Sequence, residues 1–215
     1  GVMHGYMKIP ELKKVCHAYG VSINEYLVAV YVWSVYTECM HGMPSERPVR
    51  VAVPVNLRPY FNSITTKNFF VMVSAEFHPT KEIYTFEEVL KSVSESLRSQ
   101  ISRENLEKLF SYNVSNEKLL AARIVPLFLK NLAMRYVYTT SALANTATVT
   151  NIGNISVSEE YRPYVEMFHA FLAMSKGQHL KGTICSYGDT LVFSFSYDLT
   201  DTSVQRGFFR KIAAD

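Results

Sequence analysis

The sequence is poor in glycine, cysteine and charged residues. Its 215 residues include only nine Gly and three Cys, and charged residues make up 19% of the chain. Neither GxGxxG nor GxxxxGKS/T occurs, so the common nucleotide-binding loops are excluded. The GxSxG nucleophile elbow of serine hydrolases is also absent. No run of about 18 apolar residues is present, and we therefore expect no membrane-spanning helix.

The cysteines and histidines lack the spacing of metal ligands. Cys16, Cys39 and Cys185 are odd in number and far apart, which argues against a disulfide framework and a zinc site. None of the six histidines stands four residues from another histidine. We expect no metal, and a reducing cytoplasm suits the free thiols. No signal peptide precedes the first predicted helix, and because the chain begins with Gly1 we expect it to be part of a longer protein.

The charge balance is close to neutral, whereas aromatic residues are abundant. The net charge is +3, from 22 basic and 19 acidic residues that are scattered along the chain. This is too little positive charge to indicate a nucleic-acid-binding protein. The 14 Tyr and 13 Phe, combined with few charges, indicate more buried or interface surface than a free-standing domain needs.

Helical periodicity and end signals predict several helices. Ser22 with Glu25, and Thr85 with Glu88, each have the spacing of a capping box at a helix start. Pro126 is expected to bend or break the longest of the apolar-periodic segments. The predicted helices cover residues 9–20, 23–39, 86–101, 103–114, 116–139 and 200–215.

Runs rich in β-branched and aromatic residues predict six strands. Gly188 and Asp189 join the last two in a tight hairpin, and Pro54 favours an edge or a bulge in the first. Helices and strands alternate without a linker, so we predict one α/β domain over residues 1–215, with a mixed sheet covered by helices. The predicted strands cover residues 48–57, 68–77, 145–155, 165–175, 180–189 and 190–199.

No residue constellation in the sequence indicates a catalytic centre. His169 stands in an apolar segment, where a core or interface histidine is the simpler interpretation. His17 follows Cys16 in a predicted helix, and packing explains that pair better than a nucleophile dyad does. Asp198 and Asp201 follow the last strand and suit a turn and a helix N-cap. The "TNIGN" segment is equally consistent with a site and with a plain turn, because a Gly at a strand end permits close approach of backbone or ligand.

Four motifs, in this order, resemble the chloramphenicol-acetyltransferase-like superfamily. "AYGVSINEYLVAVYVWSV" is similar to a helix of that superfamily, and "VAVPVNLRP" resembles the strand that follows it in alcohol O-acetyltransferases and condensation domains. "ATVTNIGNI" and "ICSYGDTLVFSFSYD" resemble a later strand and the final hairpin. The resemblance runs from Leu12 to Ile212, and all four motifs resemble parts of the C-terminal lobe.

The resemblance implies a two-lobed acyltransferase in which the other lobe performs the proton transfer. Family members have an HHxxxD signature in the first lobe, and its second His is the general base. The present chain contains no HxxxD; His78 is followed by Glu82, and Pro79 stands between them. The chain is therefore expected to be a C-terminal lobe without the N-terminal lobe and without a catalytic residue. No cofactor would bind tightly, and the donor would be acyl-CoA or a carrier-bound pantetheine.

The resemblance also assigns roles to particular residues. Asn56 and Arg58 would support the substrate tunnel structurally, Asn56 by capping loop backbone and Arg58 by tying the strand to a carboxylate or carbonyls. The expected residues lining the tunnel are Asn151, Gly153, Asn154, Ser186 and Tyr187.

Three functions remain open at this point. The first is the C-terminal part of an O- or N-acyltransferase acting on a small alcohol or amine, inactive without its N-terminal lobe. The second is a non-catalytic binding or scaffold module with the same fold. The third is a self-contained enzyme that uses His169 or His78. A homodimer through the exposed apolar face is a further expectation.

Overall fold

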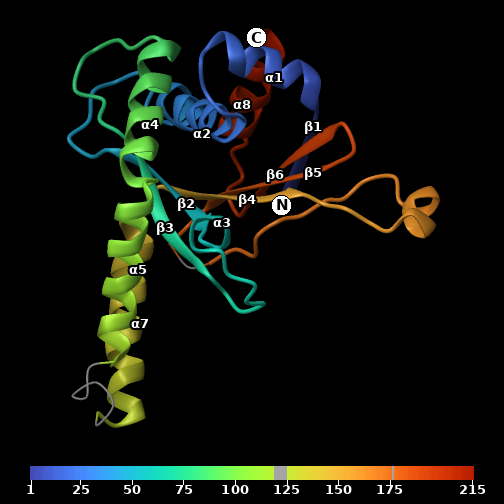
Figure 1. The fold of residues 1–215 in the computed structure, drawn as a ribbon. Helices are drawn as coiled ribbons and strands as arrows, with labels where there is room; N and C mark the ends of the chain where they lie inside the picture. Colours follow the sequence, from blue (N-terminus) through green and yellow to red (C-terminus); the bar gives the residue numbers. More distant parts are fainter. Residues whose placement is uncertain (119–124, 176) are drawn as a thin grey trace.

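The protein is built on one six-stranded mixed sheet with helices packed against one face (Figure 1). The computed structural model describes residues 1–118, 125–175 and 177–215. The strand order is β1-β6-β5-β4-β2-β3. This confirms the α/β class predicted from the sequence. The strands are β1 Val2–Lys8, β2 Val49–Asn56, β3 Phe70–Phe77, β4 Ala147–Asn154, β5 Leu180–Tyr187 and β6 Thr190–Tyr197.

Most predicted helices begin and end close to the observed positions, whereas the short helix Arg58–Phe61 was not predicted. Both predicted capping boxes are present. The side chains of Ser22 and Thr85 accept from the backbone N–H groups of Glu25 and Glu88, and the two Glu carboxylates accept in turn from the backbone N–H groups of Ser22 and Thr85. A π-helical turn at Val35–Cys39 continues α2, and a 3-10 helix covers Glu159–Tyr164. The α-helices are α1 Ile9–Ala18, α2 Ile23–Ser34, α3 Arg58–Phe61, α4 Phe86–Gln100, α5 Arg103–Lys118, α7 Leu127–Leu143 and α8 Ser203–Ala214.

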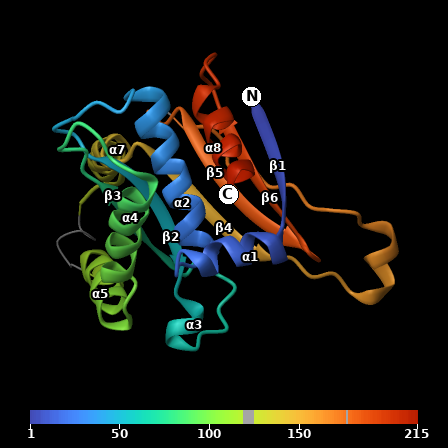
Figure 2. The same ribbon diagram turned by 90° about the horizontal axis from the view of Figure 1, so that it is seen from above.

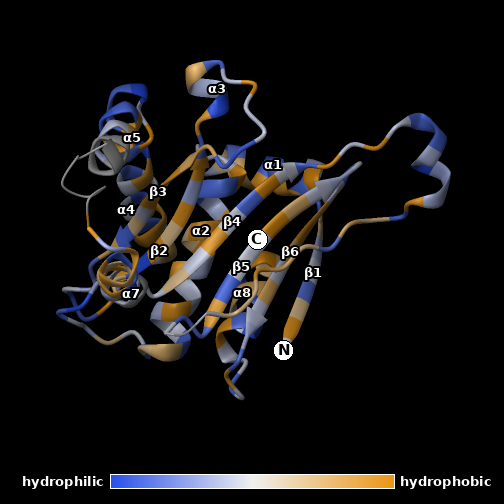
Figure 3. Cartoon of the chain, turned by 90° about the horizontal axis from the view of Figure 1, so that it is seen from below, coloured by the Kyte–Doolittle hydropathy of each residue, from blue (hydrophilic) through white to orange (hydrophobic). Residues whose placement is uncertain are grey.

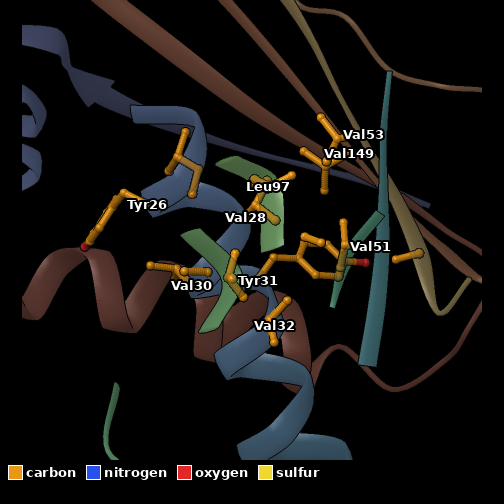
Figure 4. Packing of buried hydrophobic residues seen from close by; sticks show 14 of the residues in the cluster. Tyr26, Val28, Val30, Tyr31, Val32, Val51, Val53, Leu97 and Val149 are labelled. Carbon is orange, nitrogen blue, oxygen red and sulfur yellow. The ribbon is translucent and has the colours of Figure 1, made fainter. Parts of the chain in front are cut away.

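Helix α2 lies at the centre of the hydrophobic core (Figure 2). Its residues from Tyr26 to Val32 are fully buried, which agrees with the apolar character of its whole circumference. Side chains of α2 point toward β-sheet residues such as Val51 and Val149 in Figure 4. Helices α1, α4 and α8 lie around α2 on the same side of the sheet. The core therefore fills the space between the sheet and this helical layer.

Helices α5 and α7 both extend away from the sheet (Figure 1), and the view from above shows them apart from each other (Figure 2). The predicted helix at 116–139 is divided: α5 ends at Lys118, α7 begins after Pro126, and residues 119–124 lie outside the described part. The described side chains of α7 are mostly exposed, and many of them are large and apolar. They include Leu127, Phe128, Leu132, Met134, Tyr136 and Tyr138. No helix in the described ranges has the length and apolarity that crossing a membrane requires.

One strand prediction is wrong and one strand was not predicted. Residues 165–175 do not join the sheet; they cross its open face, opposite the helices (Figure 3), and their one ladder contact is the isolated bridge Ser175–Gln178. Two of their carbonyls accept from side chains of β5: Phe168 O from Cys185 Sγ at 3.3 Å, and Ala173 O from Lys181 Nζ at 2.9 Å. Strand β1 was missed because it pairs with β6, about 190 positions later in the sequence, and its short alternating segment does not by itself identify a strand.

The position of Pro54 within the sheet is consistent with the missing N–H of proline. Strand β2 lies between β3 and β4, yet its recorded ladder with β4 is limited to Val51–Ala147 and Ala52–Thr148. Pro54 pairs with Met72 of β3 beyond the end of that ladder. The strand is therefore central in the strand order but resembles an edge strand at Pro54.

Candidate functional site

The residues predicted to form a site lie at one edge of the sheet. Strands β2, β4 and β5 run parallel to one another, so their carboxyl ends lie at the same edge. In open α/β sheets this edge is the usual place for a ligand. Asn56 ends β2, Asn154 ends β4 and Tyr187 ends β5.

The end of β4 is shaped by a β-bulge. The register with β5 shifts between Asn151 and Gly153, and the Asn151 side-chain oxygen accepts from Gly153 N at 2.8 Å. Gly153 has a φ of 87°, a conformation that favours glycine, and no atom lies within 4 Å of where its Cβ would be. Asn151 is exposed. The bulge thus presents an amide side chain and bare backbone to open space.

The end of β5 lies directly beside this bulge. Ser186 pairs with Asn154, and its hydroxyl lies 3.4 Å from Gly153 O and 3.5 Å from Asn154 Oδ1. Ile155 N donates to Ser186 O at 2.7 Å, which continues the contact past the last ladder pair. Tyr187 instead packs edge-on against Phe168, with ring centroids 5.3 Å apart. The structure therefore brings Asn151, Gly153, Asn154 and Ser186 together and directs Tyr187 away, as part of the packing on the open face.

Asn56 and Arg58 form a separate network at the end of β2. Asn56 Oδ1 accepts from Arg58 N and from Arg58 Nη1, both at 3.1 Å. Arg58 Nε donates to Thr65 O at 2.8 Å, and Nη2 donates to Lys67 O at 2.6 Å. The guanidinium thus holds the loop after α3 by its carbonyls. Support of a substrate tunnel by this network stays a prediction.

The histidines lie away from this edge of the sheet. His78 Nε2 approaches Glu76 Oε2 at 3.4 Å in an exposed ion pair. His169 bonds to Tyr6 OH at 2.9 Å, with its ring centroid 4.6 Å from that of His4. Asp201, predicted as a turn or cap residue, accepts from Ser203 N at the start of α8. Within the described ranges no three His, Cys, Asp or Glu side chains group closely enough to hold a metal ion.

The chemistry available at this edge is hydrogen bonding. The side chains at the ends of β4 and β5 are neutral amides and hydroxyls, which donate and accept but do not titrate near neutral pH. The nearby Cys185 thiol is buried, and burial raises its pKa, so it is a poor nucleophile. These residues can orient a substrate or its carbonyl oxygen, and a base for proton transfer would have to come from elsewhere.

Sequence reasoning missed the polar residues on the open face of the sheet. His4 and Tyr6 on β1, Ser194 on β6 and Lys181 on β5 share this face with His169. Alternation of Met3, Gly5 and Met7 with His4 and Tyr6 was the available signal, but it becomes meaningful only once β1 is known to be a strand.

Comparison of sequences gives no relative for this chain. No protein-family model matches it. No curated protein matches it either.

Comparison of structures gives many similar folds at low identity. Wax ester synthase/diacylglycerol acyltransferase from Marinobacter aquaeolei VT8 superposes with a TM-score of 0.56 and 15% identity, over 99% of this chain and 47% of that chain. The nonribosomal peptide synthetase FmoA3 gives 0.64 and 16%, over 100% of this chain and 21% of that one. The epimerization domain from the third module of tyrocidine synthetase B gives 0.60 and 12%, over 100% and 47%.

In these three comparisons the chain spans less than half of the solved structure that it matches. The matched part is a mixed sheet with helices, and it accounts for almost every residue of the present chain. The chain therefore has the fold of a single lobe of the condensation and acyltransferase type.

Proposed function

We propose that this chain is one lobe of a two-lobed acyltransferase that moves an acyl group to an alcohol or amine. The observation that supports it is the combination of a single-lobe fold with a hydrogen-bonding edge that lacks a base. A second lobe, with an HHxxxD histidine, would supply the base. The donor would be acyl-CoA or a carrier-bound pantetheine, bound only during turnover.

The proposal divides the catalytic work between the lobes. General base catalysis contributes a factor of about 10² to 10⁴, and that factor would come from the other lobe. Orientation of donor and acceptor contributes up to about 7–11 kcal/mol, and the present lobe would supply part of it. Asn151, the Gly153 backbone, Asn154 and Ser186 would line the acyl-transfer tunnel at the carboxyl ends of β4 and β5.

An assay of coenzyme A release tests this division. The chain alone, given acetyl-CoA with a panel of alcohols and amines, is expected to show no turnover. Addition of the proposed second lobe with HHxxxD should restore turnover, and Asn151→Ala should then lower kcat/KM about tenfold. Ser45→Ala, at a loop far from the strand ends, serves as the matched control. Turnover by the chain alone that survives replacement of each histidine would refute the proposal.

A non-catalytic binding module is the second candidate. The observation that favours it is the exposed apolar surface of α7, since bare patches of this kind mark interaction sites. The two candidates differ in the partner lobe. If the partner lobe lacks HHxxxD and the assembled protein binds acyl-CoA without releasing coenzyme A, the scaffold function replaces the enzymatic one.

A further inference from the structure

The segment 165–175, here called the strap, covers the open face of the sheet without being part of it. Its backbone carbonyls accept hydrogen bonds from the sheet: Phe168 O from Cys185 Sγ at 3.3 Å, and Ala173 O from Lys181 Nζ at 2.9 Å. Its ring contact with β5 is the Phe168–Tyr187 pair. The strap is therefore held by a few side chains and lacks the regular ladder that locks a strand in place.

A pair of histidines joins the strap to β1. The His169 ring of the strap lies 4.6 Å from the His4 ring, measured between centroids, at an interplanar angle of 60°. His169 Nε2 bonds to Tyr6 OH at 2.9 Å, and His4 Nδ1 bonds to Ser194 Oγ at 2.7 Å. Each imidazole thus has its own hydrogen-bond partner, and the two rings pack against each other between those partners.

The face beneath the strap is polar and incompletely satisfied. Cys185 and Ser194 are fully buried, and Thr183 and Ser196 nearly so. The hydroxyls of Thr183 and Ser196 have no partner among the described protein groups. Burying an unpartnered hydroxyl costs free energy that water would relieve. Burial of these hydroxyls under the strap therefore offsets part of the free energy that the strap gains from its contacts with the sheet. A small additional free-energy cost is then enough to release the strap.

We propose that the strap is a pH-sensitive cover, which is released from the sheet when His4 and His169 are both protonated at mildly acidic pH. Two imidazolium ions in contact repel each other, and the cation on His4 has to be desolvated under the strap. Release begins at His169 and uncovers the neighbouring Cys185. The device is independent of the proposed acyl transfer, since every group involved belongs to this chain and lies on its own open face.

The direction of the pH response follows from His4. Burial first, and then the charge of His169, lower the pKa of His4 from its ordinary value of 6.5. The closed form therefore binds fewer protons than the open form, so closure is favoured above that value and weakened as the pH falls below it. The other charged or titratable groups on these elements are Tyr6 and Lys8 of β1, Lys181, Cys185 and Tyr187 of β5, Tyr197 of β6 and Glu166 of the strap.

Labelling of Cys185 with a thiol reagent measures this release. Peptide mass spectrometry gives the alkylation rates of Cys185 and of the exposed Cys39 at each pH. Dividing the first rate by the second removes the pH dependence that both thiols share through their thiolate fraction. We expect this ratio to rise about threefold or more between pH 7.5 and pH 5.5, because protonation of His4 weakens closure over this range. Cys16, buried in the core between the helices and the sheet, should stay protected throughout.

Two variants separate the histidine pair from other causes. His169→Gln keeps a hydrogen-bonding group for Tyr6 but cannot titrate, and its ratio should be the same at both pH values. His78→Gln, at a distant exposed histidine, should retain the rise of the unmodified chain. A rise that persists in His169→Gln, a constant ratio in the unmodified chain, or Cys16 labelling in step with Cys185 would each overturn the proposal.

Discussion

Single side chains stabilise irregular parts of this protein through several hydrogen bonds each. Arg58 is the clearest case, because its guanidinium reaches two loop carbonyls and the Asn56 side chain at once. A planar group with several fixed donors suits this arrangement, whereas an ammonium group does not. The strand end and the loop after α3 therefore share one residue as their common support.

Replacement of Arg58 by Lys is expected to lower the free energy of unfolding by about 1–2 kcal/mol, because Lys cannot reach all three acceptors. Urea denaturation monitored by circular dichroism measures this loss. Arg47→Lys is the matched control, since the Arg47 side chain is exposed and should tolerate the change. An equal loss in both variants would contradict the supporting role of Arg58.

The ion pair between Glu25 and Arg98 predicts a pH dependence of stability. Burial alone would raise the pKa of Glu25, but hydrogen bonds from Arg98 and Ser22 outweigh it and lower the pKa below its ordinary 4.5. A carboxyl whose pKa is lower in the folded than in the unfolded state stabilises the protein at pH values above the unfolded-state pKa. That contribution is lost as the pH falls through the folded-state pKa.

Arg98→Met removes the partner of Glu25, whose side chain is 11% exposed. At pH 7 we expect the free energy of unfolding to fall by about 1–3 kcal/mol, and at pH 3.5 by clearly less. Urea titrations at the two pH values provide the comparison. Arg103→Met, at the exposed start of α5, is the control. An effect of equal size at both pH values would show that lost packing, and not charge, explains the change.

At the scale of elements, local signals predicted most helices and the β5–β6 hairpin correctly. The capping boxes at Ser22 and Thr85 involve residues only three apart, so the sequence contains the whole determinant. The turn at Gly188 is local in the same way. Strand β1 and the strap at 165–175 depend instead on partners far along the chain, and apolar composition alone cannot tell a strand from a segment that covers one.

The candidate site shows the same difference between features set by nearby residues and features set by residues far along the chain. The parallel strand ends that bring Asn151, Gly153 and Ser186 together follow from strand order, which local pattern could not supply. The resemblance implied only that these residues line a common tunnel. The direction of Tyr187 toward Phe168 depends on the strap, which was predicted wrongly, so the sequence offered no means of separating Tyr187 from the others.

The central β4–β5–β6 packing predicts a strict requirement for Gly182. A Cβ at this position would lie 2.7 Å from Phe193 Cζ and 3.1 Å from Val149 Cγ2. Gly182→Ala is expected to lower the free energy of unfolding by about 1–3 kcal/mol through overpacking. Thermal and urea denaturation measure the change, and adding Phe193→Leu should recover part of it by removing the ring. Strictly additive losses in the double variant would contradict the proposed clash.

At the scale of the whole molecule, the exposed apolar face of α7 is expected to associate. Leu132 is 67% exposed and Tyr136 is 72% exposed, on a helix that extends from the sheet. Light scattering at rising concentration should give a mass above the 24.5 kDa of one chain, and Leu132→Glu with Tyr136→Glu should restore that value. Thr139→Glu on the same helix is the control. A single-chain mass at every concentration would remove the predicted homodimer.

The pairing of β1 with β6 affects how the chain can fold during synthesis. Val2–Lys8 leave the ribosome well before their ladder partners Thr190–Tyr197, which follow about 190 residues later. Contacts so distant in sequence form late and slow the folding of a domain. The nascent chain must therefore keep β1 unpaired, with His4 and Tyr6 in water, until β6 has been translated. The open face of the sheet at β1 is consequently completed only after β6 has emerged.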